Sequence, residues 1–334
     1  ESGGAGGTLS GTISSLQGSL GAVSAAQDIT GTLSAHRNVN SATAGGDMAG
    51  VIDALRTVGS VSAAALSGRV HGGRKVTTVN VTGPLSGTVE SDDLLGTVTA
   101  GSLNGATLAA GGDFTTLRVL GDATDSHALS GYGLGPDHAL GGGDDVLSGG
   151  DFGLIDVTGD WVHSVGAAGV GPGGDGIFGT SGDEVAPGQS DLDRVRVGGA
   201  AVDGAAGRYG FFADTALPNV SVDGTALPVG YASPSGAFRV NTVAGDDVLI
   251  GDGIPLTSGT PVVLTDAADG DEITVTLTGP GAGMILTDTD TLTANGILAI
   301  GLDATTATGS ALTIEVQAAA GGDGRFGLGS LAGG

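Results

Sequence analysis

Acidic residues next to glycines are the side chains in this sequence with the clearest potential for chemistry. Two stretches share the phrase Gly-Asp-Asp-Val-Leu, at residues 143–147 and 245–249. Calcium takes about six to eight oxygen ligands from carboxylates and carbonyls, and glycine lets the backbone turn its carbonyls towards an ion. The shared phrase therefore predicts calcium ligands, namely Asp144, Asp145, Asp246 and Asp247.

A third acidic stretch covers residues 174–184, with the sequence Gly-Asp-Gly-Ile-Phe-Gly-Thr-Ser-Gly-Asp-Glu. Its carboxylates converge if the intervening residues form a tight loop with Phe178 anchored in the core. We therefore expect a calcium ion between Asp175, Asp183 and Glu184. This stretch indicates a cation more strongly than the two shared phrases do.

A fourth acidic stretch, Thr-Asp-Ala-Ala-Asp-Gly-Asp-Glu, lies at residues 265–272. It places Asp266, Asp269 and Asp271 ahead of a predicted strand, as in the calcium loops of extracellular β-modules. The alternative for all four stretches is a solvated turn, because aspartate and glycine favour turns without any ligand.

Histidines and further carboxylates offer a second kind of chemistry. His127, His138 and His163 lie close to several aspartates in the sequence, but their spacing fits no compact metal-ligand motif, so we expect surface histidines. Paired carboxylates on a parallel β-helix could instead cleave a polysaccharide. The candidates for that reaction are Asp144, Asp145, Asp156 and Asp160.

Short strands must position these residues. Segments of about five residues alternate small or branched apolar side chains with polar ones, and glycines separate them, which is a strand pattern. The phrase Leu-Ser-Gly-Thr begins at Leu9 and again at Leu85, and degenerate copies lie between them. This self-similarity predicts the coils of a parallel β-solenoid. An antiparallel β-sandwich is the alternative.

The composition agrees with a narrow all-β core. The 334 residues include 68 glycines and 10 prolines, while aromatic residues make up only 3% of the chain. Glycine weakens helix interiors, and thin layers of Val, Leu, Ile and Ala suit a narrow cross-section. We predict an all-β chain with a β-solenoid over residues 1–240, acidic loops from about residue 121, and a smaller β-sandwich-like module over residues 241–334.

The charge excludes several classes of partner. The net charge is −25, and residues 121–334 carry −23 of it, because 28 of the 36 acids but only 5 of the 11 bases lie there. Such a chain repels nucleic acids and anionic lipid surfaces and attracts divalent cations. No apolar stretch has the length of a membrane span, and no cysteine is present. The chain begins at Glu1, which indicates a processed chain or a segment of a longer one.

Several phrases give the chain a recognisable texture, among them those at residues 153–163, 174–180, 207–212, 277–281 and 322–325. In this texture the chain resembles large Gly/Asp-rich secreted bacterial surface proteins, which contain autotransporter-like parallel β-helix stretches. The two Gly-Asp-Asp-Val-Leu phrases are similar in part to repeat-in-toxin calcium loops. The resemblance implies an extracellular or cell-surface location and brings no catalytic residue to this sequence.

These observations predict an extracellular structural protein that is not an enzyme. Its work would be to form a homopolymer by self-association, as a filament or a surface layer, because the open end of a solenoid leaves strand edges to be joined. Two alternatives are a polysaccharide lyase or hydrolase on the same scaffold and an adhesin that binds glycans.

Overall fold

The chain is described by a computed structural model in which every named element is a β-strand. It forms two compact units. The first unit contains residues 1–171, 185–202 and 213–226, and the second contains residues 172–184, 203–212 and 227–334. The described residues are 3–141, 143–173, 176–178, 183–202, 209–217, 219–227, 229, 231–232, 238–242, 254–266, 270–287, 293–294, 296–303, 309–319 and 327–333.

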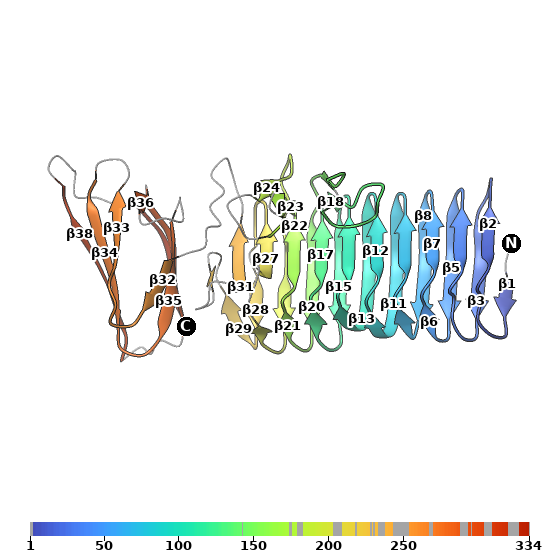
Figure 1. Ribbon diagram of the computed structural model, residues 1–334, viewed down its shortest axis with the longest axis horizontal. Helices are drawn as coiled ribbons and strands as arrows, with labels where there is room; N and C mark the ends of the chain where they lie inside the picture. Colours follow the sequence, from blue (N-terminus) through green and yellow to red (C-terminus); the bar gives the residue numbers. More distant parts are fainter. Residues whose placement is uncertain are drawn as a thin grey trace. The chain divides into compact units, whose positions relative to one another are not determined.

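The first unit is a solenoid of parallel strands in two long sheets, each strand pairing with the coil before and the coil after it (Figure 1). The first sheet contains β1 (Gly3–Ala5), β3 (Leu20–Ala25), β5 (Asn38–Ala44), β8 (Thr57–Ala63), β11 (Lys75–Leu85), β13 (Leu94–Asn104), β15 (Phe114–Val119), β20 (Phe152–Val157), β25 (Val195–Val197) and β28 (Val220–Val222).

The second sheet of the solenoid lies opposite the first and uses the alternate strands of each coil. It contains β2 (Thr12–Ser15), β4 (Thr32–Ala35), β7 (Val51–Ala54), β10 (Arg69–Gly72), β12 (Thr88–Ser91), β14 (Thr107–Ala110), β17 (His127–Ser130) and β22 (Val165–Ala168). Short strands at the turn between the sheets add to the ladder: β6 (Asp47–Met48), β9 (Ala65–Leu66), β16 (Ala123–Thr124), β21 (Trp161–Val162) and β26 (Ala201–Val202).

Hydrogen-bond partners in neighbouring coils are about 19 residues apart, and this repeat builds the core. Equivalent positions stack similar apolar side chains inside the solenoid, as in the buried ladder from Val39 through Val58 to Val76. Phe114 and Phe152 occupy the same ladder further on, and their rings stack with centroids 4.3 Å apart. The ladder thus changes from valine to phenylalanine along the solenoid, and each stretch of similar side chains fills the interior of its coils.

Aspartates at one corner of the coil bond to the next coil. The Asp28 carboxylate accepts a hydrogen bond from the backbone N–H of Asp47 (2.8 Å), and Asp122 accepts one from the N–H of Asp160 (2.9 Å). Asp160 in turn accepts one from the N–H of Ala200 (2.8 Å). Part of the acidic composition therefore serves the inter-coil ladder.

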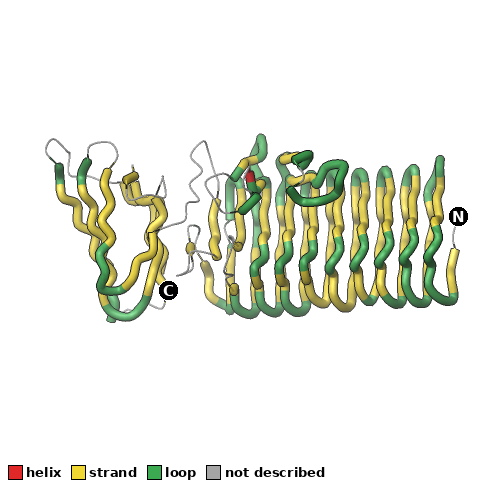
Figure 2. The backbone as a smooth tube through the Cα atoms, in the orientation of Figure 1, coloured by secondary structure: helices red, strands yellow, loops and turns green. Residues whose placement is uncertain are grey.

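The connection that follows each strand of the second sheet differs widely in length from coil to coil. Two residues, 73–74, join β10 to β11, whereas residues 131–151 join β17 to β20. We call residues 131–141 and 143–150 the inserted loop; Figure 2 shows it projecting beyond the short corners of the coils that precede it. Beneath it the outward-facing third residue of each second-sheet strand becomes buried: it is half-buried in β7 and β10 but buried in β12, β14 and β17.

The second unit contains two four-stranded sheets. Their buried side chains form one cluster that draws on both sheets, with Leu256 and Ile285 from one and Leu264 and Ile273 from the other. The strands are β32 (Ile254–Thr257), β35 (Ala282–Thr287), β37 (Gly296–Asp303) and β39 (Gly327–Gly333) in one sheet, and β36 (Thr293–Ala294), β33 (Val262–Asp266), β34 (Glu272–Thr278) and β38 (Ala311–Gln317) in the other.

The predicted all-β class and the parallel β-solenoid are confirmed, and the antiparallel sandwich is wrong for the first unit because its stacked strands pair in parallel. The sandwich-like module stays a prediction. So does the division at residues 240 and 241, because residues 243–253 lie outside the described part of the chain. Among the described residues, no helix has the length and apolar character needed to cross a bilayer.

Candidate functional site

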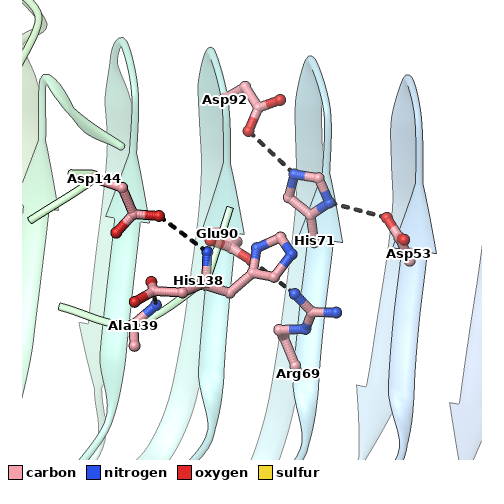
Figure 3. Close-up of polar contacts among 9 residues, drawn as sticks. Asp53, Arg69, His71, Glu90, Asp92, His138, Ala139 and Asp144 are labelled. Atoms are coloured by element: carbon pink, nitrogen blue, oxygen red, sulfur yellow. Dashed lines mark hydrogen bonds and ion pairs between the residues drawn. The ribbon is translucent and has the colours of Figure 1, made fainter. Parts of the chain in front are cut away.

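Polar side chains from the second sheet and from the inserted loop lie close together at one place (Figure 3). Those on the sheet are Asp53, Arg69, His71 and Glu90, and the one on the loop is His138. The parallel register puts Asp53, His71 and Glu90 at the same outward position of β7, β10 and β12, in three successive coils. Neighbouring strands of a sheet lie about 4.8 Å apart, so these side chains are within reach of one another. The inserted loop adds His138 from outside.

His71 lies between two carboxylates. Its Nδ1 is 2.9 Å from an oxygen of Asp53, and its Nε2 is 3.1 Å from an oxygen of Asp92, the first residue after β12. Burial disfavours the imidazolium, but the hydrogen bonds to Asp53 and Asp92 outweigh burial and raise the pKa of His71 to about 9. The same hydrogen bond lowers the pKa of Asp53, against the effect of its burial. At neutral pH the ring is an imidazolium: its Nδ1–H donates to Asp53 and its Nε2–H donates to Asp92.

Glu90 is the buried acid of the group, only 5% exposed. Burial raises its pKa to about 7, although the charges of His71 and Arg69 act in the opposite direction. Its Oε1 lies 2.6 Å from His138 Nδ1 and 3.7 Å from Arg69 Nη1. A carboxyl group with a pKa near neutral pH that lies beside two imidazoles can exchange a proton, and such a group is suited to acid–base chemistry.

The inserted loop holds His138 against Glu90. The strands β18 (Tyr132–Gly133) and β19 (Val146–Leu147) pair antiparallel at its base. The Tyr132 hydroxyl donates to Asp145 Oδ2 at 2.7 Å, and Gly141 N–H donates to the same oxygen at 2.7 Å. His138 has a φ of +58°, a left-handed conformation that costs free energy for a residue with a side chain.

The loop and the second sheet enclose a pocket with a volume of about 450 Å³. Its wall includes His71, Glu90, Asp92 and His138 on the polar side, and Tyr132 and Leu134 on the apolar side. One ligand atom each from His71, Glu90 and His138 lies within 4.8 Å of the other two. The arrangement can hold a cation or exchange a proton with a small polar molecule.

The structure gives Asp144 and Asp145, predicted as calcium ligands, contacts within the inserted loop. Asp145 bonds to Tyr132 and Gly141 as described above, and Asp144 Oδ2 accepts the backbone N–H of Asp137 at 3.2 Å. These bonds close the loop through one oxygen of each carboxylate. Calcium binding at this place stays a prediction.

The other predicted calcium ligands lie in the second unit. Asp183 is buried and Glu184 is exposed. Asp266 and Asp271 come together at the turn between β33 and β34: both are buried, and the N–H of Asp266 donates to the carbonyl of Asp271 at 2.7 Å. Asp271 Oδ1 also accepts the N–H of Ala319 at 2.7 Å. The remaining ligands, Asp175, Asp246, Asp247 and Asp269, lie outside the described residues.

The carboxylates considered for polysaccharide cleavage lie on three different parts of the first unit. Asp156 lies on β20, in register with Arg118 and Arg196 of the neighbouring coils, and Asp160 bonds to the next coil at a corner. Asp144 and Asp145 belong to the inserted loop. The candidate acid–base residues that the structure brings together are instead His71, Glu90 and His138.

Sequence reasoning missed His71 and Glu90 and took His138 for a surface residue. The signal for the first two was the coil period: the segments Ile-Asp-Ala at residue 52, Val-His-Gly at 70 and Val-Glu-Ser at 89 align at intervals of 18 and 19 residues. No spacing in the sequence indicates His138, because the inserted loop folds back to coils that precede it by about 50 and 70 residues.

Comparison with known proteins adds no assignment to this geometry. No protein-family model, curated protein or solved structure matches the chain.

Proposed function

We propose that the protein is an extracellular structural protein, a subunit that self-associates into a filament or a surface layer and does not act as an enzyme. The observation that carries the proposal is the parallel pairing of the solenoid strands, which runs from β3 to β20 along the first sheet with one register shift, between Val81 and Pro84 of β11. A stack of this kind is rigid along its axis, and small side chains are enough to fill its interior.

The outer faces of the solenoid support the proposal. The outward positions of the first sheet carry small polar residues, such as Ser41, Ser60 and Thr78 in three successive coils. Flat faces of short polar side chains favour lateral packing between rods more than they favour recognition of a small molecule. An acidic chain needs cations at such contacts, so calcium belongs to this proposal as the ion that bridges subunits.

Electron microscopy of the purified protein tests the proposal. We expect regular filaments or sheets when the protein is concentrated in the presence of calcium, and their dispersal by a chelator. Sedimentation then measures the fraction assembled at each calcium concentration. If the protein sediments only as a monomer at high concentration with calcium present, the proposed assembly is wrong.

The pocket beneath the inserted loop favours a second candidate, a polysaccharide lyase or hydrolase. Glu90, with its pKa of about 7, and His71 could act as acid and base on a glycan that enters the pocket. A panel of acidic polysaccharides tests this candidate. Turnover that Glu90→Gln abolishes would support it, while saturable binding without turnover would support a glycan-binding adhesin instead.

A further inference from the structure

We propose that His71, Glu90 and His138 bind a divalent transition-metal ion of the zinc class. Two imidazoles and one carboxylate form the donor set, and their ligand atoms lie within 4.8 Å of one another. Imidazole nitrogens select zinc, copper, nickel or iron, whereas calcium and magnesium prefer oxygen donors alone. This site is therefore chemically distinct from the acidic loops for which the sequence predicts calcium.

The neighbours of His71 orient it as a ligand. Its Nδ1 bonds to Asp53 at 2.9 Å, which leaves Nε2, now 3.1 Å from the exposed Asp92 carboxylate, as the nitrogen that can bind a metal. Histidines that bind metals commonly use one ring nitrogen as the ligand and donate the other N–H to a carboxylate, which fixes the ring and makes it more basic. Asp53 is thus a positioning residue for His71.

The fourth ligand position is open towards the pocket. Asp92 Oδ1 lies 3.1 Å from His71 Nε2, and the Asp92 side chain is 67% exposed, so it can turn to coordinate the ion. The metal must displace the proton on His71 Nε2, which this nitrogen donates to Asp92 in the metal-free chain. It must also separate Glu90 Oε1 from His138 Nδ1, now 2.6 Å apart, to about 3.3 Å, the spacing of two tetrahedral ligands at zinc distances.

The metal would fasten the inserted loop to the solenoid. His71 and Glu90 lie on β10 and β12, which are parts of the rigid ladder, while His138 comes from the loop. One bound ion thus joins segments about 50 and 70 residues apart in the sequence. The His71 and His138 rings already lie near each other, with centroids 5.0 Å apart.

Titration of the full chain with zinc alone, after treatment with a chelator and dialysis, tests the proposal. We expect one site by calorimetry or by competition with a chromogenic chelator, and a rise in melting temperature on binding. Cobalt in place of zinc reports the ligands through its visible absorption, which a merely structural role of these residues would not produce. Calcium at the same concentration should not compete for the site.

Three variants make the test specific. His138→Gln removes a ligand from a loop outside the solenoid core and should abolish zinc binding and the cobalt spectrum, while the circular dichroism of the solenoid is retained. Asp53→Asn should weaken zinc binding about 10- to 100-fold, as loss of a residue that orients a ligand does. His163→Gln is the matched control, because His163 also pairs with an aspartate, Asp125, at 3.3 Å, and it should bind zinc as the unaltered chain does.

The proposal is overturned if the unaltered chain binds no zinc, or if His138→Gln binds zinc as tightly as the unaltered chain. Equal loss of binding in His138→Gln and His163→Gln would also overturn it, since it would indicate scattered surface histidines. Filament formation that persists in His138→Gln separates this site from the proposed structural function.

Discussion

Glycine and aspartate are linked in this solenoid by steric contact as well as by composition. A Cβ atom on Gly46 would overlap the carboxylate of Asp28, which reaches across to bond the N–H of Asp47. Gly159 stands in the same relation to Asp122, and Gly199 to Asp160. In these three pairs the residue just before the N–H donor must therefore be a glycine, whereas Ser190 precedes the N–H of Asp191, which donates to Asp151.

This relation predicts a non-additive pair of substitutions. Gly46→Ala should destabilise the chain by about 1 to 3 kcal/mol, because the added methyl group forces Asp28 out of its hydrogen bond. In an Asp28→Ala background, Gly46→Ala should destabilise the chain much less, because the two atoms nearest to the added methyl group belong to the Asp28 carboxylate, which is then absent. Urea denaturation of the four proteins measures the coupling. Equal costs in both backgrounds would show that the carboxylate does not need the space.

The burial of His127 leads us to expect that the stability of the folded chain depends on pH. Burial lowers its pKa below 6.5, although the charge of Asp125 partly opposes this. Above pH 6.5 the ring is neutral in both the folded and the unfolded chain and contributes no pH dependence. As the pH falls below 6.5 the unfolded chain takes up the proton first, so the stability decreases until the folded pKa is reached.

We therefore expect the change in melting temperature from pH 7 to pH 5 to be more favourable in His127→Gln than in the unaltered chain, in which protonation of Glu90, with its pKa of about 7, opposes the effect of His127. His36→Gln is the control, because His36 lies exposed at a corner of the solenoid. If both variants show the same change in melting temperature as the unaltered chain over this range, the pH dependence comes from other groups.

At the scale of elements, the inserted loop is fixed at its base by the bond between Tyr132 and Asp145. Tyr132→Phe removes the hydroxyl that donates to Asp145, at 2.7 Å, and keeps the buried ring. We expect a loss of about 1 kcal/mol and faster hydrogen exchange or proteolysis within the loop, with no change in the solenoid strands. Exchange measured by mass spectrometry distinguishes the two regions, and faster exchange throughout β10 to β17 would contradict this assignment.

The repeating elements could be predicted from the sequence, and the physical reason is visible in the register. Leu9 and Leu85, the first residues of the repeated Leu-Ser-Gly-Thr phrase, occupy one ladder position, connected through Ile29, Met48 and Leu66 in the intervening coils. Each coil must place an apolar residue there, so the pattern survives in the sequence. The repeating strands could therefore be predicted from the sequence alone.

The candidate site could be predicted only in part, because it depends on two features that do not repeat. One is the difference between coils of 18 and 19 residues, which decides whether His71 and Glu90 align. The other is the path of the inserted loop, which no periodicity constrains. His138 had no regular relation to its partners in the sequence, and its contact with Glu90 required the folded chain.

At the scale of the whole molecule, the charge of −25 predicts a strong response to salt. Screening should raise the melting temperature between low and moderate sodium chloride, because it weakens repulsion among the acidic groups. Calcium chloride at matched ionic strength should raise the melting temperature further if the acidic loops bind it. Identical melting temperatures in the two salts, with and without a chelator, would show that these loops are solvated turns.

The corner that follows each strand of the second sheet has one more consequence. The connection at this corner is residues 73–74 in one coil and residues 131–151 in another. The strands on either side of it pair with the neighbouring coils in both cases, so the pairing does not depend on the length of the connection. Insertions and deletions at this corner can accumulate during evolution without disturbing the core. A peptide epitope or a small domain placed between the exposed residues Leu55 and Arg56, at the same corner of an earlier coil, should be displayed at the surface in the same way, which makes the solenoid a scaffold for engineered presentation.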